Sequence, residues 1–554
     1  MSRRRRRSAG RAPVATSDGV GRAAAAAPVS PSVYGAADLR PAGFVDWNPP
    51  NRSADAGWLP EREISTGRIR DVARNEGWAS AGVDRAVDML VGAHLRLNAK
   101  PDPAGLGVGP EVANEIGKSI QTAWRAWAED PIFRSDAERQ LSFSGLAALV
   151  AREFVAVGEG LAVLRWLERP GWTFGTAIHV VEVDRLSNPY GRQNDDHLRG
   201  GVEKDENGAP IAYHMRRSHP GDVAASRAGS MIWNRIPRWD VNNGWERPKV
   251  LHVYDKREPG QSRGVSRLVA SLLRLKMLSR YTDSEVRAAA INASIVGAIY
   301  TQLGAEYAAE AIGVDGGAGT TDWGAFNGQR SAYYDERLAA VDGTRLVRLF
   351  PSDRLDLNST PRQTAGLPAF QTAFLQSFAS TLGISYEQLS MDWSRTNYSS
   401  ARAALNEVWR GTTRLRQVLI EMFAQPVYIA FLEEILVNEL IDVPSGLPSF
   451  YEAPAAWSRA NWIGPGRGYI DPTKEAEAAI MRIKGRLSTL EREAGEQGVD
   501  WEQNLDQIEI EEADMRRRNM DLPSTGIPAG GLQPNAAPRD TRDDRPGDED
   551  GGRD

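Results

Sequence analysis

Apolar residues recur at helical spacing in the first part of the chain that can form a core. Between residues 64 and 97, Val83, Val87 and Leu90 fall on one face, which predicts helix throughout this region. The same spacing predicts a second helix over about 112–127. The folded part of the chain is therefore expected to begin with helices.

The pattern changes to short apolar runs typical of strands between residues 145 and 260. The Asn207-Gly208 pair predicts a hairpin turn within this region. The predicted strands cover 161–167, 177–183, 211–215 and 250–254. His179, His214 and His252 lie in these runs and are interpreted as packed or surface histidines. The region is predicted to be a mixed α+β unit.

Two further helices are predicted on either side of a small β-containing insert. The first covers 264–290. In the second, large apolar side chains recur every four residues, as Phe370, Phe374, Phe378 and Leu382. Between the helices, β-type runs at 295–300 and 346–350 flank a glycine-rich stretch, 313–324. A last helical region is predicted over 472–510.

A polar segment, residues 392–400, precedes a predicted long helix, 401–441. Thr396 and Asn397 are suitable N-caps for this helix. Pro426 predicts a kink in it, because proline lacks a backbone donor and clashes with the preceding turn.

Composition narrows the classes of protein that fit. The chain has 554 residues, 41% apolar and 25% charged, which excludes collagen-like and wholly disordered proteins. At about 150 residues per domain, this length allows roughly three or four folding units. The absence of cysteine excludes thiolate nucleophiles, cysteine-ligated zinc and iron–sulfur clusters.

The formal net charge of −6 is unevenly distributed. Residues 1–33 hold seven Arg against one Asp, a net charge of +6, and residues 523–554 hold seven acids against four Arg, a net charge of −3. The body, 34–522, therefore carries −9. An acidic body disfavours tight, sequence-independent binding of nucleic acid, which needs clustered Lys and Arg. Both termini are poor in large apolar residues and are predicted to be disordered.

Targeting signals are not expected. No apolar stretch follows the arginine run after Ser2, so the N-terminus does not look like a secretory signal, and the chain is expected to stay in the cytoplasm. The most apolar stretch, residues 418–437, contains three Glu and one Pro, so no membrane span is expected.

Motifs for catalysis are weak or missing. A nucleotide-binding P-loop needs lysine after a glycine-rich loop, and the only Gly-Lys pair, Gly117-Lys118, lies in a helical pattern. No Gly-x-Ser-x-Gly motif of a serine nucleophile is expected, and the six His do not form HExxH. Asp195-Asp196-His197 could ligate Mg or Mn, but its polar, glycine-containing surroundings favour a solvated turn. We therefore expect no enzyme activity, no cofactor and no metal.

Several motifs occur in a recognisable order along the body. The most specific is LSMDWSRTNYSSAR at 389–402, preceded by LGISYE at 382–387. Further segments are RDVARN at 70–75, residues 201–213, HPGD at 219–222, residues 257–264 and 457–472, and GVDW at 498–501. Together they resemble the lambda-type portal proteins of tailed bacteriophages. The resemblance covers roughly residues 34–522 and leaves out the arginine-rich arm, the glycine-rich stretch and the acidic tail.

The resemblance implies a head-to-tail connector: a ring, usually of twelve subunits, at one vertex of the capsid. Double-stranded DNA would enter through this ring during packaging and leave through it during ejection. The implied partners are the terminase large subunit, a head-completion or adaptor protein, and the capsid and scaffold proteins, with no membrane partner. The protein would be assembled in the bacterial host cytoplasm and carried in the virion.

The resemblance also implies a portal fold of the α+β class and divides the chain into parts. These are a disordered Arg-rich arm (1–33), the N-terminal part of the wing (34–260), a first stem helix (261–290), a β-containing clip (291–360), a second stem helix (361–383), a tunnel loop (384–400), a long kinked wing helix (401–445), a helical crown (446–522) and a disordered acidic tail (523–554).

The resemblance places the residues that face DNA in the tunnel loop: Asp392, Trp393, Ser394, Arg395, Thr396, Asn397, Tyr398, Ser399 and Ser400. Arg395, with Asn397 and Tyr398, is expected to lie closest to the DNA. The alternative is that Asn397 and the serines only cap the long helix.

Two alternatives remain open from the sequence. The arm, with Arg3, Arg4, Arg5, Arg6 and Arg7, either contacts DNA or scaffold inside the assembling shell or has no dedicated role. The chain as a whole could instead be another structural head protein, a scaffold or capsid component without a channel. A packaging ATPase would need the P-loop that the sequence lacks.

Overall fold

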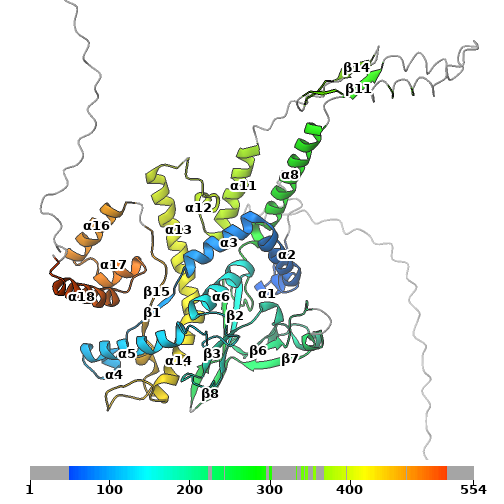
Figure 1. The fold of residues 1–554 in the computed structure, drawn as a ribbon. Coiled ribbons are helices and arrows are strands. Elements are labelled where there is room, and N and C mark those ends of the chain that lie inside the picture. The colour runs from blue at the N-terminus through cyan, green and yellow to red at the C-terminus, as the bar shows by residue number, and fades with distance from the viewer. Residues whose placement is uncertain are drawn as a thin grey trace, which may run out of the picture. The chain divides into compact units, whose positions relative to one another are not determined.

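The structure is a computed structural model of the whole chain (Figure 1). The residues that it describes are 49–222, 227–242, 244–294, 298–301, 328, 332, 339–341, 344–346, 353–356, 367–394, 396–468 and 471–520. The predictions for the arm, the glycine-rich stretch and the acidic tail lie outside the described residues, and so does Arg395.

The region from residue 64 to 97 forms two helices and a strand, so the prediction of helix throughout was wrong. After α1 (Ala54–Trp58), helix α2 (Arg62–Asn75) ends at Glu76, whose extended backbone separates it from α3 (Gly77–Leu90). The Glu76 carboxylate accepts a hydrogen bond from the Ala79 amide at 2.8 Å and caps α3. Gly92, with φ of 60°, then turns the chain into strand β1 (Arg96–Ala99).

The helix predicted over 112–127 is confirmed as α5 (Pro110–Ala128), which follows the short α4 (Pro103–Leu106). Helix α6 (Phe143–Val157) was not predicted. Nine of its fifteen residues are buried, so its sequence is apolar on nearly all sides and shows no one-sided helical stripe.

Short antiparallel sheets follow, as expected of a mixed α+β unit. The predicted turn at Asn207-Gly208 joins two strands, and Gly208 has the positive φ, 83°, that such a turn favours. The strand predicted at 177–183 ends at Val180, and the 3₁₀ turn η2 (Val183–Arg185) follows. The strands pair in the orders β10-β2-β3, β4-β5-β6-β7 and β8-β9.

The bounds of these elements are β2 (Glu159–Trp166), β3 (Thr176–Val180), η3 (Pro189–Gly191), β4 (Leu198–Arg199), β5 (Val202–Lys204), β6 (Pro210–Arg216), α7 (Arg227–Ser230), β7 (Trp233–Pro237), β8 (Trp239–Asn242), β9 (Trp245–Pro248) and β10 (Val250–Tyr254).

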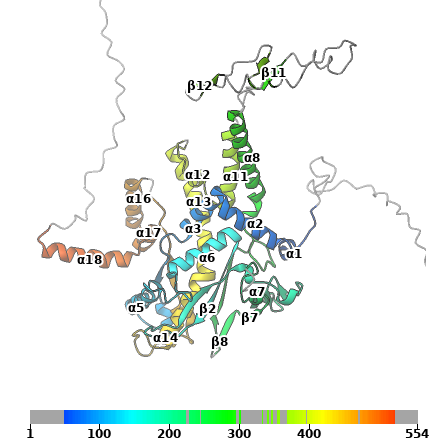
Figure 2. The ribbon, with the colours of Figure 1, turned by 45° about the vertical axis from the view of Figure 1, so that its right-hand side comes forward.

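Helices α8 (Val269–Ser294) and α11 (Leu367–Leu382) lie side by side (Figures 1 and 2). Ser271 meets Thr381 at one end of the pair, and Tyr281 meets Phe370 further along, so the helices are antiparallel. Helix α8 begins at Val269, five residues later than predicted, because the residues before it are held in a hydrogen-bonded loop.

The insert between these helices contains paired strands. Strand β11 (Ala298–Thr301) pairs with β14 (Asp353–Asp356), and β12 (Ala339–Val341) pairs with β13 (Thr344–Leu346). Strand β11 confirms the run predicted at 295–300. Most of the other predicted run, 346–350, lies outside the described residues.

The long helix begins earlier than predicted and is not regular. It consists of α13 (Tyr398–Leu419), the π-helical turn η5 (Ile420–Ala424) and α14 (Gln425–Val437). Pro426 is the second residue of α14 and cannot donate to the carbonyl four residues before it, within the π-helical turn, which explains why the regular pattern is interrupted there. The helix ends at Val437 and does not reach residue 441.

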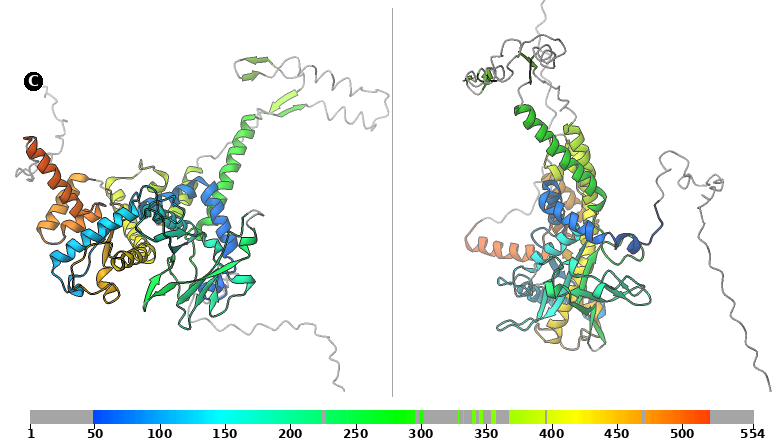
Figure 3. Two further views of the ribbon diagram at one scale, coloured as in Figure 1. Left: turned by 60° about the horizontal axis from the view of Figure 1, so that its bottom comes forward. Right: turned by 90° about the vertical axis from the view of Figure 1, so that its right-hand side faces the viewer.

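The helical region predicted over 472–510 consists of three helices, α16, α17 and α18. Each helix starts at a side chain that caps it, namely Asp471, Thr489 or Asp500. Strand β15 pairs with β1 and so joins this region to the first half of the chain. The elements are α15 (Pro454–Trp457), β15 (Ala460–Ile463), α16 (Pro472–Lys484), α17 (Leu490–Glu496) and α18 (Trp501–Arg517), and Figure 3 shows them in further views.

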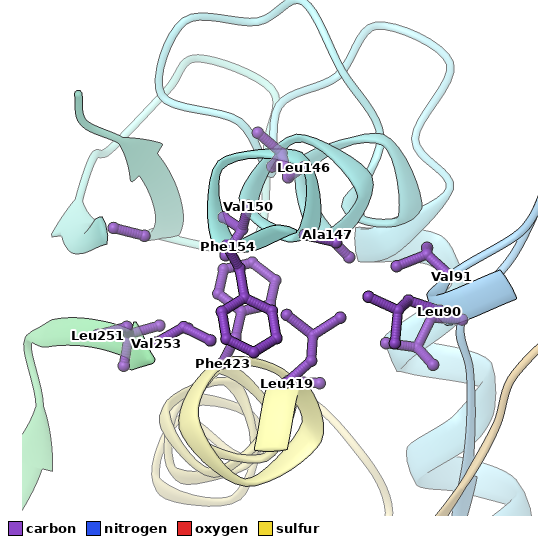
Figure 4. Packing of buried hydrophobic residues seen from close by; sticks show 14 of the residues in the cluster. Leu90, Val91, Leu146, Ala147, Val150, Phe154, Leu251, Val253, Leu419 and Phe423 are labelled. Atoms are coloured by element: carbon purple, nitrogen blue, oxygen red, sulfur yellow. The ribbon is translucent and has the colours of Figure 1, made fainter. Parts of the chain in front are cut away.

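The core forms around the middle of the long helix. Leu419 and Phe423 are fully buried and face Phe154 on α6, Leu90 on α3 and Val253 on β10 (Figure 4). The long helix is therefore fixed at its π-helical turn, while its first residues, including Ser399 and Ser400, are exposed.

Candidate functional site

The predicted tunnel loop, 384–400, is not a loop throughout, because it contains the short helix α12 (Tyr386–Ser390). A capping box fixes its start: the Ser385 hydroxyl accepts from the Gln388 amide at 3.2 Å, and the Gln388 side chain accepts from the Ser385 amide at 3.0 Å. Leu389 is buried, and Met391, with φ of 57°, ends the helix. The polar segment therefore starts from a fixed point.

Hydrogen bonds within the polar segment set its conformation. The Asp392 carboxylate accepts from the Ser394 amide at 3.0 Å, and the Thr396 hydroxyl donates to Glu387 on α12 at 3.3 Å. The Asn397 side chain accepts from the Ser400 amide at 2.9 Å, so the interpretation of Asn397 as an N-cap is confirmed. A DNA contact by Asn397 stays a prediction.

The structure brings the described residues of this segment together at the start of α13. The exposed side chains at this point include Met391, Trp393, Ser399 and Ser400. Tyr398 is the first residue of α13. Arg395 is the only cation of the sequence between residues 391 and 400.

A buried ionic cluster lies where the β-sheets lead into α8. Its centre is Glu159, the first residue of β2, which is fully buried. Arg263 donates to its carboxylate at 2.6 Å and Arg62 at 2.8 Å. The His252 ring lies 2.9 Å from the same carboxylate, and the Gly264 amide donates to it at 2.9 Å.

The two guanidinium groups of the cluster also bind backbone carbonyls. Arg263 donates to Leu186 at 2.8 Å and to Gly200 at 2.7 Å, and both Arg62 and Arg263 donate to Val183. The cluster therefore connects α2, the sheets and the loop before α8, which are far apart in the sequence.

The protonation of the cluster follows from burial and charge. Burial alone would raise the pKa of Glu159, but Arg263, Arg62 and the His252 hydrogen bond hold that pKa well below its usual range. Burial lowers the pKa of His252. At neutral pH the cluster therefore contains a carboxylate, two guanidinium groups and a neutral imidazole.

Two glycines let the chain segments of the cluster approach each other. A Cβ on Gly264 would lie 2.2 Å from the carbonyl oxygen of Gly158, closer than atoms can pack. Gly158 itself has φ of 96°, which favours glycine. The end of α6 and the loop before α8 are thus in backbone contact.

A second ionic group, around Asp255, connects the long helix to the same loop. Arg414 on α13 donates to Asp255 at 2.9 Å, and Arg267 donates to it at 3.2 Å. Hydrogen bonds from Arg414, and then from Arg267 and Arg257, hold the pKa of Asp255 well below its usual range. The position of α13 is therefore coupled to the start of α8.

Residues 260–264 have the Gly-x-Ser-x-Gly spacing of a serine nucleophile, so the expectation that this motif is absent was wrong. Ser262 is buried, its hydroxyl bonds to the Asp55 carboxylate, and its amide donates to Asp55 at 2.8 Å. A nucleophilic serine needs an accessible hydroxyl and an adjacent base. The geometry of Ser262 supports a structural contact between α1 and this loop.

Other candidate chemistry is weak among the described residues. Asp195 accepts from the His197 and Leu198 amides, which confirms the solvated turn. In the described part of the chain, no three His, Asp or Glu side chains are grouped so that they could hold a metal ion.

Within the same described residues, no helix combines the length and the apolar character needed to cross a bilayer.

The sequence prediction missed both ionic groups. The one signal available was Glu159 itself, a charged residue next to an otherwise apolar strand run. Its partners could not be identified, because they lie 97, 93 and 104 positions away, at Arg62, His252 and Arg263.

Comparison with known proteins shows which class this arrangement belongs to. Residues 41–416 match the family described as phage portal protein, lambda family. The class is thus that of the phage portal proteins, and the chain belongs to their lambda family.

Curated relatives agree with this family. The chain is 32% identical to the portal protein of Escherichia phage N15 and 31% identical to portal protein B of Escherichia phage lambda. Each alignment covers 86% of this chain and 89% of the relative. The probable portal protein of Halomonas phage phiHAP-1 is 24% identical over 79% of this chain and 81% of its own length.

A solved structure of the neck of a gene transfer agent particle is more distantly similar. It has a TM-score of 0.39 and 11% identity over 80% of this chain and 99% of its own chain.

Proposed function

We propose that the chain forms a ring of about twelve subunits at one capsid vertex and that double-stranded DNA passes through it during packaging and ejection. The observation that carries this proposal is the membership of the lambda portal family, with an alignment to the N15 portal protein over 86% of the chain. A ring needs two different contact faces on each subunit.

The parts of the proposed portal follow the observed elements. The helices and sheets from α1 to β10 form the wing, α8 and α11 form the stem, and the strand pairs between them form the clip. The segment 384–400, which includes α12 and the start of α13, forms the tunnel loop, the rest of α13 with α14 forms the long wing helix, and α15–α18 form the crown. The two ionic groups then lie where wing, stem and long helix meet.

Charge supports a channel in which DNA slides. Twelve copies at −6 give roughly −72, and an acidic wall repels phosphates instead of binding them tightly. Within this wall, Arg395 provides transient phosphate contacts. The terminase large subunit, an adaptor protein, and capsid and scaffold proteins are the proposed partners during assembly in the host cytoplasm.

We expect purified protein to form rings with a central hole about as wide as duplex DNA. Negative-stain electron microscopy of the full chain checks this, with particle diameters compared between class averages. Shell-like assemblies would favour the other structural role, a scaffold or capsid component without a channel. A protein that stays monomeric at high concentration would contradict the proposed function.

Replacing Arg395 with alanine is expected to reduce the yield of DNA-filled heads several-fold, because one phosphate contact per subunit is lost around the ring. The measurement is the amount of nuclease-protected DNA per head after packaging. The control is Arg410→Ala, which removes an exposed cation from α13 whose partner is Glu407 at 3.3 Å. Normal packaging and retention by the Arg395 variant would contradict the role of this residue.

A further inference from the structure

A cavity of about 300 Å³ lies between the sheets and the π-helical turn of the long helix. Strands β6, β8, β9 and β10 contribute one part of its wall, and Glu421, Met422 and Pro426 on η5 and α14 contribute another. The volume is at the lower end of the range of small-molecule sites, roughly 300–1,000 Å³. Single π-helical turns occur frequently at functional sites. The cavity is therefore large enough for a small molecule, and an irregular turn of the long helix borders it.

Aromatic rings from neighbouring strands form a flat part of the wall. Tyr213 on β6 lies edge-on to His252 on β10, with ring centres 5.6 Å apart, and the His252 ring centre lies 4.7 Å from that of Tyr254. Trp239 on β8 also lines the cavity. Rings of this kind provide flat surfaces on which a planar ligand can stack.

The Tyr213 hydroxyl provides a polar group that the fold itself does not use. Tyr213 is only 2% exposed, and no hydrogen bond joins its hydroxyl to another residue that the structure describes. Buried hydroxyls normally have a partner, so this one is available to a molecule in the cavity. Burial raises the pKa of Tyr213, and the hydroxyl is therefore protonated at neutral pH and can donate a hydrogen bond.

Two cations line the same cavity. In the described ranges, no carboxylate lies within ion-pair distance of Arg238 or Lys256. The Arg238 guanidinium lies over the Trp239 ring, 4.9 Å from its centre. Glu421 also lines the cavity, but its carboxylate accepts from Gln417 at 2.9 Å. Two cations thus face one acid that already has a partner, and the charge of the cavity favours an anion.

We propose that this cavity binds a small aromatic anion, that is, a flat ring carrying a phosphate or a carboxylate group. Arg238 and Lys256 bind the anionic group, the Tyr213 hydroxyl donates to the ligand, and the ring stacks in the aromatic wall. A nucleoside monophosphate and a benzoate-type acid share this chemistry. The cavity is too small for duplex DNA, so the site is separate from the proposed channel and does not depend on the ring.

Thermal unfolding of the full-length protein tests the site with three compounds at equal ionic strength: thymidine monophosphate, benzoate and thymidine. A ligand that binds only the folded protein stabilises it, so we expect the melting temperature to rise with the concentration of at least one of the two anions. Thymidine, which lacks the anionic group, should give a several-fold smaller rise. The anion with the larger effect identifies the natural ligand as a phosphate or a carboxylate. No rise with either anion at millimolar concentration would overturn the proposal.

Replacing Arg238 with glutamine should weaken binding of the anion about tenfold, because a charge-assisted hydrogen bond is lost. The matched control is Arg217→Gln, which removes the same charge from an exposed residue outside the cavity and should bind as the unchanged protein does. Isothermal titration calorimetry measures both variants. Equal affinities of the Arg238 variant and the unchanged protein would contradict binding in this cavity.

Tyr213→Phe separates a ligand contact from a structural role. The hydroxyl has no partner among the described residues, so its removal should leave the melting temperature without ligand unchanged and weaken binding several-fold. Lower stability without ligand, together with unchanged binding, would show that Tyr213 is structural and would overturn its assignment to the site. None of these measurements needs ring formation, so the proposed function is tested separately by the ring images.

Discussion

Replacing Glu159 with glutamine is expected to lower the free energy of unfolding by about 3–5 kcal/mol at neutral pH, because it leaves two buried guanidinium groups without their shared anion. Arg263 is 1% exposed and Arg62 is 9% exposed, so solvent cannot replace the carboxylate. Urea and thermal unfolding, followed by circular dichroism, measure the change. A Glu159→Gln variant that does not fold at all would also agree with this prediction, because it too has lost stability.

The control for this prediction is Glu153→Gln. The Glu153 side chain is 22% exposed and pairs with Arg70 at 2.7 Å, but Arg70 keeps a second partner in Asp184 at 2.8 Å. A loss of about 1 kcal/mol or less is expected for an accessible pair of this kind. If the two variants lost equal amounts of unfolding free energy, burial of the Glu159 cluster would not be what makes it important for stability.

Acid should also distinguish the Glu159 variant from the unchanged protein. The pKa of Glu159 is lower in the folded than in the unfolded state, so its contribution to stability is complete above the unfolded value of about 4.5 and is lost as pH falls below it. Glu159→Gln removes this contribution at every pH. The difference in stability between the two proteins should therefore shrink as the solution is acidified below about pH 4.5.

Elements with a one-sided or alternating pattern could be predicted from the sequence. The strand at 250–254 and helix α11 have the predicted positions because their apolar periodicity reflects local packing. Helix α6 was missed because its apolar residues surround it on all sides. The break at Glu76 was missed because a single extended residue hardly disturbs the periodicity on either side of it.

The candidate site shows the same division between local and distant determinants. The capping role of Asn397 was one of the two predicted roles, because an N-cap depends only on the next three residues. The partners of Glu159 and Asp255 could not be predicted, because each ionic group forms only when the fold brings distant segments together. Arg414 and Asp255, for example, are 159 residues apart.

Replacing Trp124 with alanine is expected to lower the free energy of unfolding by about 3–5 kcal/mol, the cost of removing a large buried aromatic side chain. Trp124 on α5 is 3% exposed, and its ring lies 4.9 Å from Phe143 on α6, 5.3 Å from Phe431 on α14 and 5.7 Å from Trp462 on β15. The Trp124 ring therefore connects α5 with α6, α14 and β15, and the cavity left by its removal would loosen the packing of all four.

Trp166→Ala is the control for the Trp124 variant, because Trp166 is 51% exposed and its loss should cost about 1 kcal/mol or less. Unfolding in urea measures both variants, and hydrogen exchange of β1 and β15 tests the consequence for the C-terminal region. Because Trp462 belongs to β15, exchange of the β1–β15 pair should accelerate in the Trp124 variant and not in the control. Unchanged protection of that pair would show that its own hydrogen bonds, and not the aromatic cluster, hold β15 to β1.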